Sequence, residues 1–268
     1  MQKSYPEQLQ PEDVLFFLHI PKTAGTSLTQ ELTQYWGAEC TLTPDQLNTA
    51  KAQPRQRLAD AKFIYGHFSR AVCRRRLPNP PTFTITFLRD PVDHFLSLYH
   101  HLQRDANFAY TTRITLGDRE LSHHISDLAR TGSMEDFLAT QESQLFSNFQ
   151  SRYLVRGMRF QPDVSERPEL GVLAEKCLLE LGAFGITDHY EDSLLLIRQA
   201  LGLKDSLRAR TTNMAPNRQR GSAPSPDILG EINSRTRYDR ELFDIALTTF
   251  KARLAASTTA NPLERGKG

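Results

Sequence analysis

The stretch VLFFLHIPKTAGTS, residues 14–27, decides the fold. It opens with an apolar run from Val14 to Ile20 that Pro21 ends, a pattern typical of a strand buried on both faces of a parallel sheet. A small, hydroxyl-rich segment follows and supplies candidate cap residues for a helix, whose apolar positions recur at helical spacing: Leu28, Leu32, Tyr35 and Trp36. The sequence therefore predicts a strand, a tight turn and a helix in direct succession.

The same alternation of strand and helix runs through the rest of the chain. Further strands are predicted at 62–65, 83–88 and 183–186, and further helices at 91–102, 190–201 and 238–254. Strands that alternate with helices favour a parallel sheet with helices on both faces. We therefore expect an α/β fold with a P-loop-like central parallel sheet flanked by helices.

Three segments depart from this alternation. The stretch from about 104 to 157 is polar and mostly helical with no clear strand, as an insertion that shapes a substrate cleft would be. Residues 203–226 are rich in Arg, Asn, Pro and Ser and predict a long loop, which in a compact domain is more often functional or disordered than neutral. The C-terminal tail, about 256–268, is expected to be flexible.

Composition indicates an ordinary globular chain of 268 residues, 39% hydrophobic and 24% charged, which we treat as a single domain over 1–268. Because 33 basic residues face 31 acidic ones, the overall charge gives no reason to expect a nucleic-acid partner. The three cysteines, an odd number without a C-x-x-C pair, argue against a disulfide framework or a zinc site. With neither a signal-peptide pattern nor a membrane-spanning apolar run, we expect a cytoplasmic protein.

The segment His19–Ser27 has the features of an anion-binding loop. It is predicted to lie between a strand and the start of a helix, where backbone N–H groups and the helix dipole favour a phosphate or sulfate. It is not a Walker A motif, because Lys22 precedes Gly25 instead of following the second glycine of G-x-x-x-x-G-K-[ST]. An ordinary strand-to-helix turn with an N-cap is the alternative interpretation.

Several segments together resemble a known family. The segment 19–28 is similar to the 5′-phosphosulfate loop of sulfotransferases that use 3′-phosphoadenosine 5′-phosphosulfate (PAPS), and FLRDP at 87–91 with FLSLY at 95–99 resembles their 3′-phosphate motif. The heparan sulfate and uronyl 2-O-sulfotransferases and their bacterial relatives are the branch it resembles most. That branch shares three weaker segments, YGHF at 65–68, NFQSRYL at 148–154 and FGIT at 184–187.

The resemblance implies a donor site for PAPS. Lys22 would neutralise charge on the leaving phosphate–sulfate bridge, and the rest of the loop would offer further contacts from Thr23, Ala24, Gly25, Thr26 and Ser27. Arg89 and Ser97, eight positions apart, would converge on the 3′-phosphate. In the family a basic loop folds over the nucleotide, so the resemblance also places near that phosphate Arg210, Thr211 and Thr212.

The implied catalytic residues are Lys22 and His67. The family carries a catalytic histidine in the segment that YGHF matches, and an imidazole near neutral pKa can take the proton of an acceptor hydroxyl. A structural role for a histidine after a strand is the alternative. Three other histidines carry no family match and are expected on a helix surface: His94, His100 and His101.

The acceptor stays open at this point, although the insertion at 104–157 would shape its cleft. The basic cluster of Arg70, Arg74, Arg75 and Arg76 could hold an anionic saccharide or lipid headgroup, and a solvated face is the alternative. Many relatives have Glu-Arg where this chain has Asp93-His94, so an ion pair is expected to be altered. The animal enzymes also carry a Golgi membrane anchor, which we do not expect here.

The sequence thus favours a sulfotransferase that moves a sulfuryl group from PAPS to a hydroxyl of a carbohydrate or a small metabolite, with no metal required. A nucleotide kinase is one alternative, disfavoured by the missing Walker A motif and by the lack of an obvious acidic motif for Mg²⁺. A nucleotide-binding module without turnover is the other.

Overall fold

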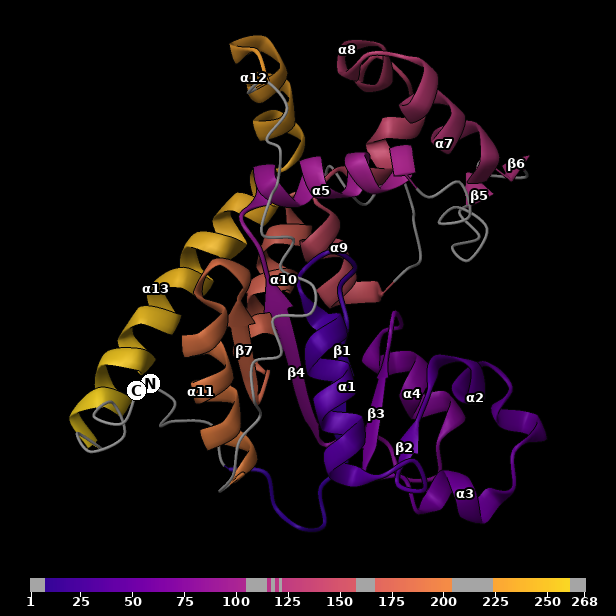
Figure 1. Ribbon diagram of the computed structural model, residues 1–268, viewed down its shortest axis with the longest axis vertical. Helices are drawn as coiled ribbons and strands as arrows, with labels where there is room; N and C mark the ends of the chain where they lie inside the picture. Colours follow the sequence, from indigo (N-terminus) through magenta and orange to yellow (C-terminus); the bar gives the residue numbers. More distant parts are fainter. Residues whose placement is uncertain are drawn as a thin grey trace.

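The fold is a five-stranded parallel sheet with helices on both faces, so the predicted α/β class is confirmed (Figure 1). The computed structural model describes residues 8–104, 115–116, 119–120, 122–157, 167–203 and 224–260. The strand order is β2-β3-β1-β4-β7. These strands have the bounds Leu15–Leu18 (β1), Thr41–Leu42 (β2), Phe63–Gly66 (β3), Phe83–Leu88 (β4) and Ala183–Ile186 (β7). The sequence prediction missed β2, because two residues are too short to show a periodic pattern.

The side chains of β1 divide the core into two layers. Leu15 and Phe17 pack on one face with α1 (Gly25–Trp36) and α11 (Tyr190–Leu201). Phe16 and Leu18 point to the other face, which is covered by α9 (Phe149–Arg156), α10 (Glu169–Leu179) and α13 (Arg237–Ala260). The strand is buried on both sides, as the apolar run predicted.

Short helical elements complete the sheet layers. They are α2 (Pro44–Asn48), η1 (Ala50–Ala52), α3 (Arg55–Ala59), α4 (Arg70–Arg76) and η4 (Thr187–His189). Leu47, Leu58 and Cys73, from α2, α3 and α4, join the core on the α13 face. Cys40, Cys73 and Cys177 are free thiols. In the parts of the chain that the structure describes, no helix is both long and apolar enough to cross a bilayer.

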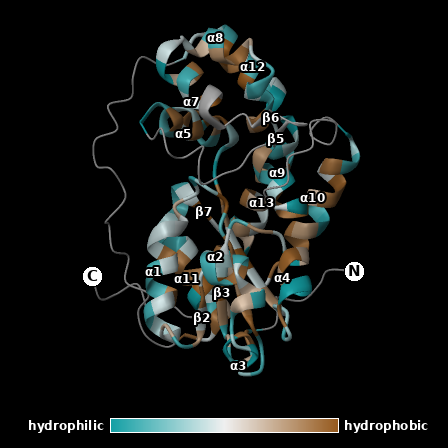
Figure 2. Cartoon of the chain, turned by 90° about the vertical axis from the view of Figure 1, so that its right-hand side faces the viewer, coloured by the Kyte–Doolittle hydropathy of each residue, from teal (hydrophilic) through white to brown (hydrophobic). Residues whose placement is uncertain are grey.

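A second group of helices lies beyond the carboxyl ends of the strands, as both views show (Figures 1 and 2). It consists of α5 (Pro91–Arg104), α7 (Ser122–Thr131), α8 (Met134–Leu138), η2 (Glu142–Phe146) and α12 (Pro226–Arg235), which share a third apolar cluster. Three of these elements, α7, α8 and η2, lie within the range 104–157 that was expected to be an insertion, whereas α9 of the same range packs on the sheet. The prediction of no strand there is wrong, because β5 (Thr115–Leu116) and β6 (Arg119–Glu120) form an antiparallel pair.

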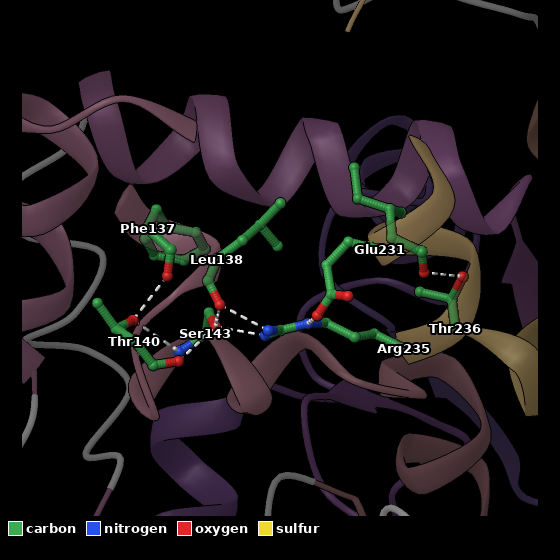
Figure 3. A network of polar contacts seen from close by, with 8 residues as sticks. Phe137, Leu138, Thr140, Ser143, Glu231, Arg235 and Thr236 are labelled. Carbon is green, nitrogen blue, oxygen red and sulfur yellow. Dashed lines mark hydrogen bonds and ion pairs between the residues drawn. The ribbon is translucent and has the colours of Figure 1, made fainter. Parts of the chain in front are cut away.

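Arg235, at the end of α12, joins that helix to the rest of this helical group. In Figure 3 its guanidinium reaches the Ser143 hydroxyl and the Leu138 carbonyl, while its Nε lies 2.6 Å from the Glu231 carboxylate. The backbone carbonyl of Arg235 also accepts a hydrogen bond of 3.0 Å from the Asn148 N–H. The end of α12 is therefore fixed to both η2 and the start of α9.

The C-terminal helix α13 is longer than the sequence predicted. The tail was expected to be flexible from about residue 256, but the helix continues to Ala260. Ser257 Oγ donates a hydrogen bond of 2.9 Å to Gln199 Oε1 on α11, which holds this end of the helix against the sheet layer. The expectation for 261–268 lies outside the described residues.

The N-termini of α9 and α13 cap each other. Asn148 Oδ1 accepts hydrogen bonds from the N–H groups of Tyr238 and Asp239, at 2.9 and 3.4 Å. In return the Asp239 carboxylate accepts from the N–H groups of Gln150 and Ser151, at 3.0 and 2.7 Å, and from the Ser151 hydroxyl. Asp239 is 2% exposed, and burial raises the pKa of its carboxyl. Each of these two side chains therefore satisfies donors that the start of the other helix leaves unpaired.

We expect Asp239→Asn to lower the free energy of unfolding by about 1–3 kcal/mol, because an amide NH₂ would face one of the backbone N–H groups and leave it unsatisfied. Chemical denaturation measures the change. Asp244→Asn, an exposed position on the same helix, is the matched control and should stay within ~0.5 kcal/mol of wild type. Equal stability of the two variants would contradict the capping role.

Candidate donor and catalytic site

Most of the predicted site residues that the structure describes lie on segments that leave the carboxyl edge of the sheet. Leu18 pairs with Gly66 and Leu88 pairs with Ile186, so the segments that follow β1, β3, β4 and β7 all leave the same edge. A crevice outside the carboxyl ends of parallel strands, where the chain switches direction in the sheet, is the usual place for a ligand in such folds. β1 is the switch strand here, because the chain passes to β3 on one side and to β4 on the other.

The backbone between β1 and α1 has an unusual conformation. Lys22 and Ala24 have φ of 67° and 65°, and they are two of the three non-glycine residues with positive φ among those described. Such a conformation costs roughly 1–2 kcal/mol per residue, and strain of this kind concentrates at binding sites. The expected side-chain cap is wrong: Ala24 occupies the N-cap and no side chain caps α1. The first-turn N–H groups therefore have no intrahelical partner.

Five successive carbonyl groups of this loop accept hydrogen bonds from side chains. The donors are His67 Nδ1 to His19 O (2.6 Å), Thr23 Oγ1 to Ile20 O (2.8 Å), His94 Nε2 to Pro21 O (2.8 Å), Arg89 Nη1 to Lys22 O (3.3 Å) and Thr187 Oγ1 to Thr23 O (3.2 Å). Because the carbonyl oxygens are turned toward these donors, the loop can present its N–H groups to a ligand. Backbone N–H groups at the start of a helix can bind an anion, so this loop is the candidate anion site.

Arg89 follows β4 directly and is 6% exposed. Its contact with the Lys22 carbonyl brings a second cation beside the loop. Ser97 lies in α5, the helix that begins two residues after Arg89, and is 9% exposed. Asp90, between them, caps α5 through hydrogen bonds from Val92 N and Asp93 N and forms an ion pair of 2.8 Å with Arg240.

The hydrogen bond from His67 to the His19 carbonyl decides the tautomer of His67. A carbonyl only accepts, so Nδ1 carries the proton and Nε2 carries the lone pair. The His67 ring lies 4.8 Å from the His19 ring. Burial lowers the pKa of His67 from its ordinary value of 6.5, against the opposing effect of the hydrogen bond to His19. His67 is therefore a neutral imidazole with a basic Nε2 at pH 7.

His94 is not on the helix surface, where it was expected. It is 1% exposed, and burial lowers its pKa to about 4. Its ring packs against Phe149, with centroids 5.5 Å apart, while Nε2 holds the Pro21 carbonyl. The sequence could not indicate this supporting role, because His94 lies outside the motifs that match the family. His100 is exposed, as expected, and His101 is partly buried.

Comparisons with known proteins assign the chain to a family. A family model described as "Sulfotransferase family" matches residues 8–244. The chain belongs to the sulfotransferase family. It is 25% identical to heparan-sulfate 6-O-sulfotransferase 1 of Cricetulus griseus over 290 residues, covering 94% of this chain and 71% of the relative. The human protein of the same name is 25% identical, and the match covers 94% of this chain and 69% of the relative. The Gallus gallus protein is 26% identical, and the match covers 89% of this chain and 66% of the relative.

The protein is therefore a PAPS-dependent sulfotransferase, which catalyses sulfuryl transfer. The relatives carry 6-O names, whereas the sequence motifs pointed to the 2-O branch. The shared motifs thus identified the family and its donor, but they do not identify the branch.

Some predicted features of the sulfotransferase lie apart from the loop or outside the description. Arg210, Thr211 and Thr212 lie outside the described residues. In the basic cluster, Arg70 pairs with Glu180 at 3.0 Å, and Arg76 donates to Leu47 O and Asn48 Oδ1. Arg74 and Arg75 are exposed on α4. Among the described residues, no three His, Cys, Asp or Glu side chains gather as a metal site would need.

A cavity of about 450 Å³ lies elsewhere in the sulfotransferase, between β7, α11 and α13. It is lined by the start of β7 with Phe184, and by Leu196, Phe250 and Arg253. None of the predicted site residues that the structure describes borders it, and it is at the amino end of β7 instead of the carboxyl end. The loop, and not this cavity, is therefore the candidate site.

Besides the role of His94, sequence reasoning missed two supporting residues of the site, Thr187 and Gln150. The Thr187 hydroxyl lies 3.2 Å from Thr23 O and 3.1 Å from Leu88 O, so it bridges the loop and the end of β4. Both residues fell inside segments that matched the family only weakly, FGIT and NFQSRYL. Those matches showed that the two segments belong to the family pattern, but they did not show which side chains bond to the loop or to Arg89.

Gly25 allows the close approach of helix α1 to His19. A Cβ on Gly25 would lie 2.4 Å from His19 Cδ2 and 2.7 Å from Phe17 Cζ. We therefore expect Gly25→Ala to lower the free energy of unfolding by about 1–3 kcal/mol through overpacking and to displace the His19 ring. Chemical denaturation measures this effect.

Gly230→Ala is the matched control for that substitution, because Gly230 lies within α12 and a Cβ there would meet nothing within 4 Å. It should raise the free energy of unfolding by up to ~1 kcal/mol, the helix-propensity difference between Ala and Gly. A Gly25→Ala variant as stable as wild type would contradict the close packing at His19.

Proposed function

We propose that this sulfotransferase transfers the sulfuryl group of PAPS to a hydroxyl of an anionic saccharide, with the loop after β1 holding the 5′-phosphosulfate. The observation that carries the proposal is the set of five side chains that donate hydrogen bonds to five successive carbonyls of the loop before helix α1. The saccharide acceptor is inferred from the relatives, which are named as heparan-sulfate sulfotransferases.

The donor site combines backbone donors with two cations. The loop N–H groups and the hydroxyls of Thr26 and Ser27 would contact the 5′-phosphosulfate, in the manner of a P-loop. Arg89 would bind the 3′-phosphate, with Ser97 on the next helix as its partner. The family resemblance adds to this phosphate site Arg210, Thr211 and Thr212. This donor set fits a nucleotide with two anionic phosphate groups, since Arg89 donates a hydrogen bond to the backbone carbonyl of Lys22 in the loop.

Catalysis in this proposal needs positioning, proton removal and charge stabilisation. Bound PAPS supplies the sulfuryl group. His67 Nε2 accepts the proton of the acceptor hydroxyl as its oxygen forms the new bond to sulfur, and Nδ1 stays bonded to the His19 carbonyl. Lys22 stabilises the charge that develops on the phosphate oxygen when the old bond to sulfur breaks.

The acceptor face in this proposal includes the exposed part of α4. Arg74 and Arg75 follow His67 closely in sequence, and neither is buried. Two exposed cations on the helix that follows the base in sequence favour an acceptor with carboxylate or sulfate groups. The relatives' names favour the 6-hydroxyl over the 2-hydroxyl as the position modified. The cytoplasmic location expected from the sequence stays a prediction.

The test is transfer of ³⁵S from labelled PAPS to desulfated heparin, followed by disaccharide analysis to find the modified hydroxyl. The wild type should label the chain at the 6-position, and His67→Ala should lower the rate by roughly 10²–10⁴-fold, the usual contribution of a general base. His100→Ala, an exposed histidine of α5, is the matched control and should keep the wild-type rate. Labelling of small alcohols but not of the saccharide would contradict the proposal that the acceptor is a saccharide.

The pH dependence of the same reaction tests the base. Because burial lowers the pKa of His67 below 6.5, the neutral form persists at pH 7, and kcat/KM should be flat from pH 7 to 8. It should fall only when the pH drops through the lowered pKa and the imidazole becomes protonated. An acid limb centred above 6.5, or one that persists in His67→Ala, would contradict the assignment.

A further inference from the structure

Gln150 makes two hydrogen bonds to the backbone of Arg89. The Arg89 N–H donates to Gln150 Oε1, and Gln150 Nε2 donates to Arg89 O, each at 2.9 Å. Gln150 is 1% exposed. β4 ends at Leu88, where its register with β7 also ends, so the Arg89 peptide groups lie just beyond the sheet ladder. The Gln150 amide therefore extends the hydrogen bonding of the strand by one residue.

Gln150 is held in place in two ways: its own backbone N–H is bonded, and the start of its helix α9 is bonded to the start of α13. Its N–H donates to Asp239, and the same carboxylate holds Ser151. Asn148, just before it, accepts from the first turn of α13. The amide thus projects from a helix start that is tied to a second helix 89 residues later in the chain. A side chain held in this way has little freedom to follow a shift of Arg89.

The far end of Arg89 contacts the anion loop. Its Nη1 donates to the Lys22 carbonyl at 3.3 Å, while its peptide is clamped by Gln150. Arg89 is therefore fixed at the backbone by one partner and at the guanidinium by another. Since a shift of about 1 Å in a binding group can cost on the order of 10²-fold, the clamp bears on how well the guanidinium meets an anion.

We propose that Gln150 is a positioning residue for Arg89 and thereby sets the preference of the enzyme for nucleotides that carry a 3′-phosphate. This inference rests on the proposed function, in which Arg89 binds that phosphate. It predicts that loss of the amide weakens binding of the 3′-phosphate specifically and leaves binding at the β1–α1 loop unchanged.

The experiment compares adenosine 3′,5′-bisphosphate with adenosine 5′-monophosphate by calorimetry, because the two ligands differ only in the 3′-phosphate. The wild type should favour the bisphosphate, and Arg89→Ala should remove most of that preference. Gln150→Met, which keeps the volume but makes neither hydrogen bond, should lower the affinity ratio about tenfold with monophosphate binding unchanged.

Two further variants separate positioning from stability. Ser151→Ala removes one hydrogen bond of the same helix start without touching the Arg89 clamp, so it should be less stable but keep the wild-type ratio. Gln150→Glu is the replacement test variant if Gln150→Met does not fold. Its carboxylate can accept from the Arg89 N–H but cannot donate to Arg89 O, so it should also lower the ratio.

The outcomes are distinct. A wild type that binds both nucleotides equally would contradict the proposed function itself, whatever Gln150 does. A wild type that prefers the bisphosphate, together with a folded Gln150 variant that keeps the full ratio, would overturn the positioning role alone. A fall in affinity for both nucleotides by the same factor would show that Gln150 supports the fold and not the 3′-phosphate contact.

Discussion

The site depends on one backbone segment, the loop between β1 and α1, in which carbonyl groups 19–23 are all held by side chains. These side chains come from the segments after β3, β4 and β7, from helix α5 and from the loop itself. The left-handed conformations of Lys22 and Ala24 are unfavourable in isolation, so the surrounding contacts must maintain them. A preorganised loop of this kind needs little rearrangement to receive an anion.

The charge around this loop is simpler than its three histidines suggest. Burial lowers the pKa of His19 to about 3 and that of His94 to about 4, and it lowers the pKa of His67 as well. Neutral imidazoles can donate to carbonyls without adding charge. Among the described residues of the loop and the side chains that hold its carbonyls, the positive charge is therefore carried by Lys22 and Arg89, while the histidines supply shape, hydrogen bonds and one basic nitrogen.

The sequence predicted the strands and helices with strong patterns, and β4, β7 and α11 have the predicted bounds. It could not predict contacts made at long range. His94 follows Asp93 in an amphipathic helix, but α5 is covered on two sides, by the loop and by α9, so its position is buried. The clamp of Gln150 on Arg89 joins residues 61 apart, which no local pattern encodes.

In the proposed function, the strained loop and the clamped Arg89 form one site for a nucleotide with two phosphate groups. A crystal structure with adenosine 3′,5′-bisphosphate tests this most directly. We predict the 5′-phosphate on the N–H groups of residues 22–27 and the 3′-phosphate on the Arg89 guanidinium, with His67 Nδ1 still bonded to the His19 carbonyl. A nucleotide in the cavity between α11 and α13, or phosphates that contact neither group, would contradict the account.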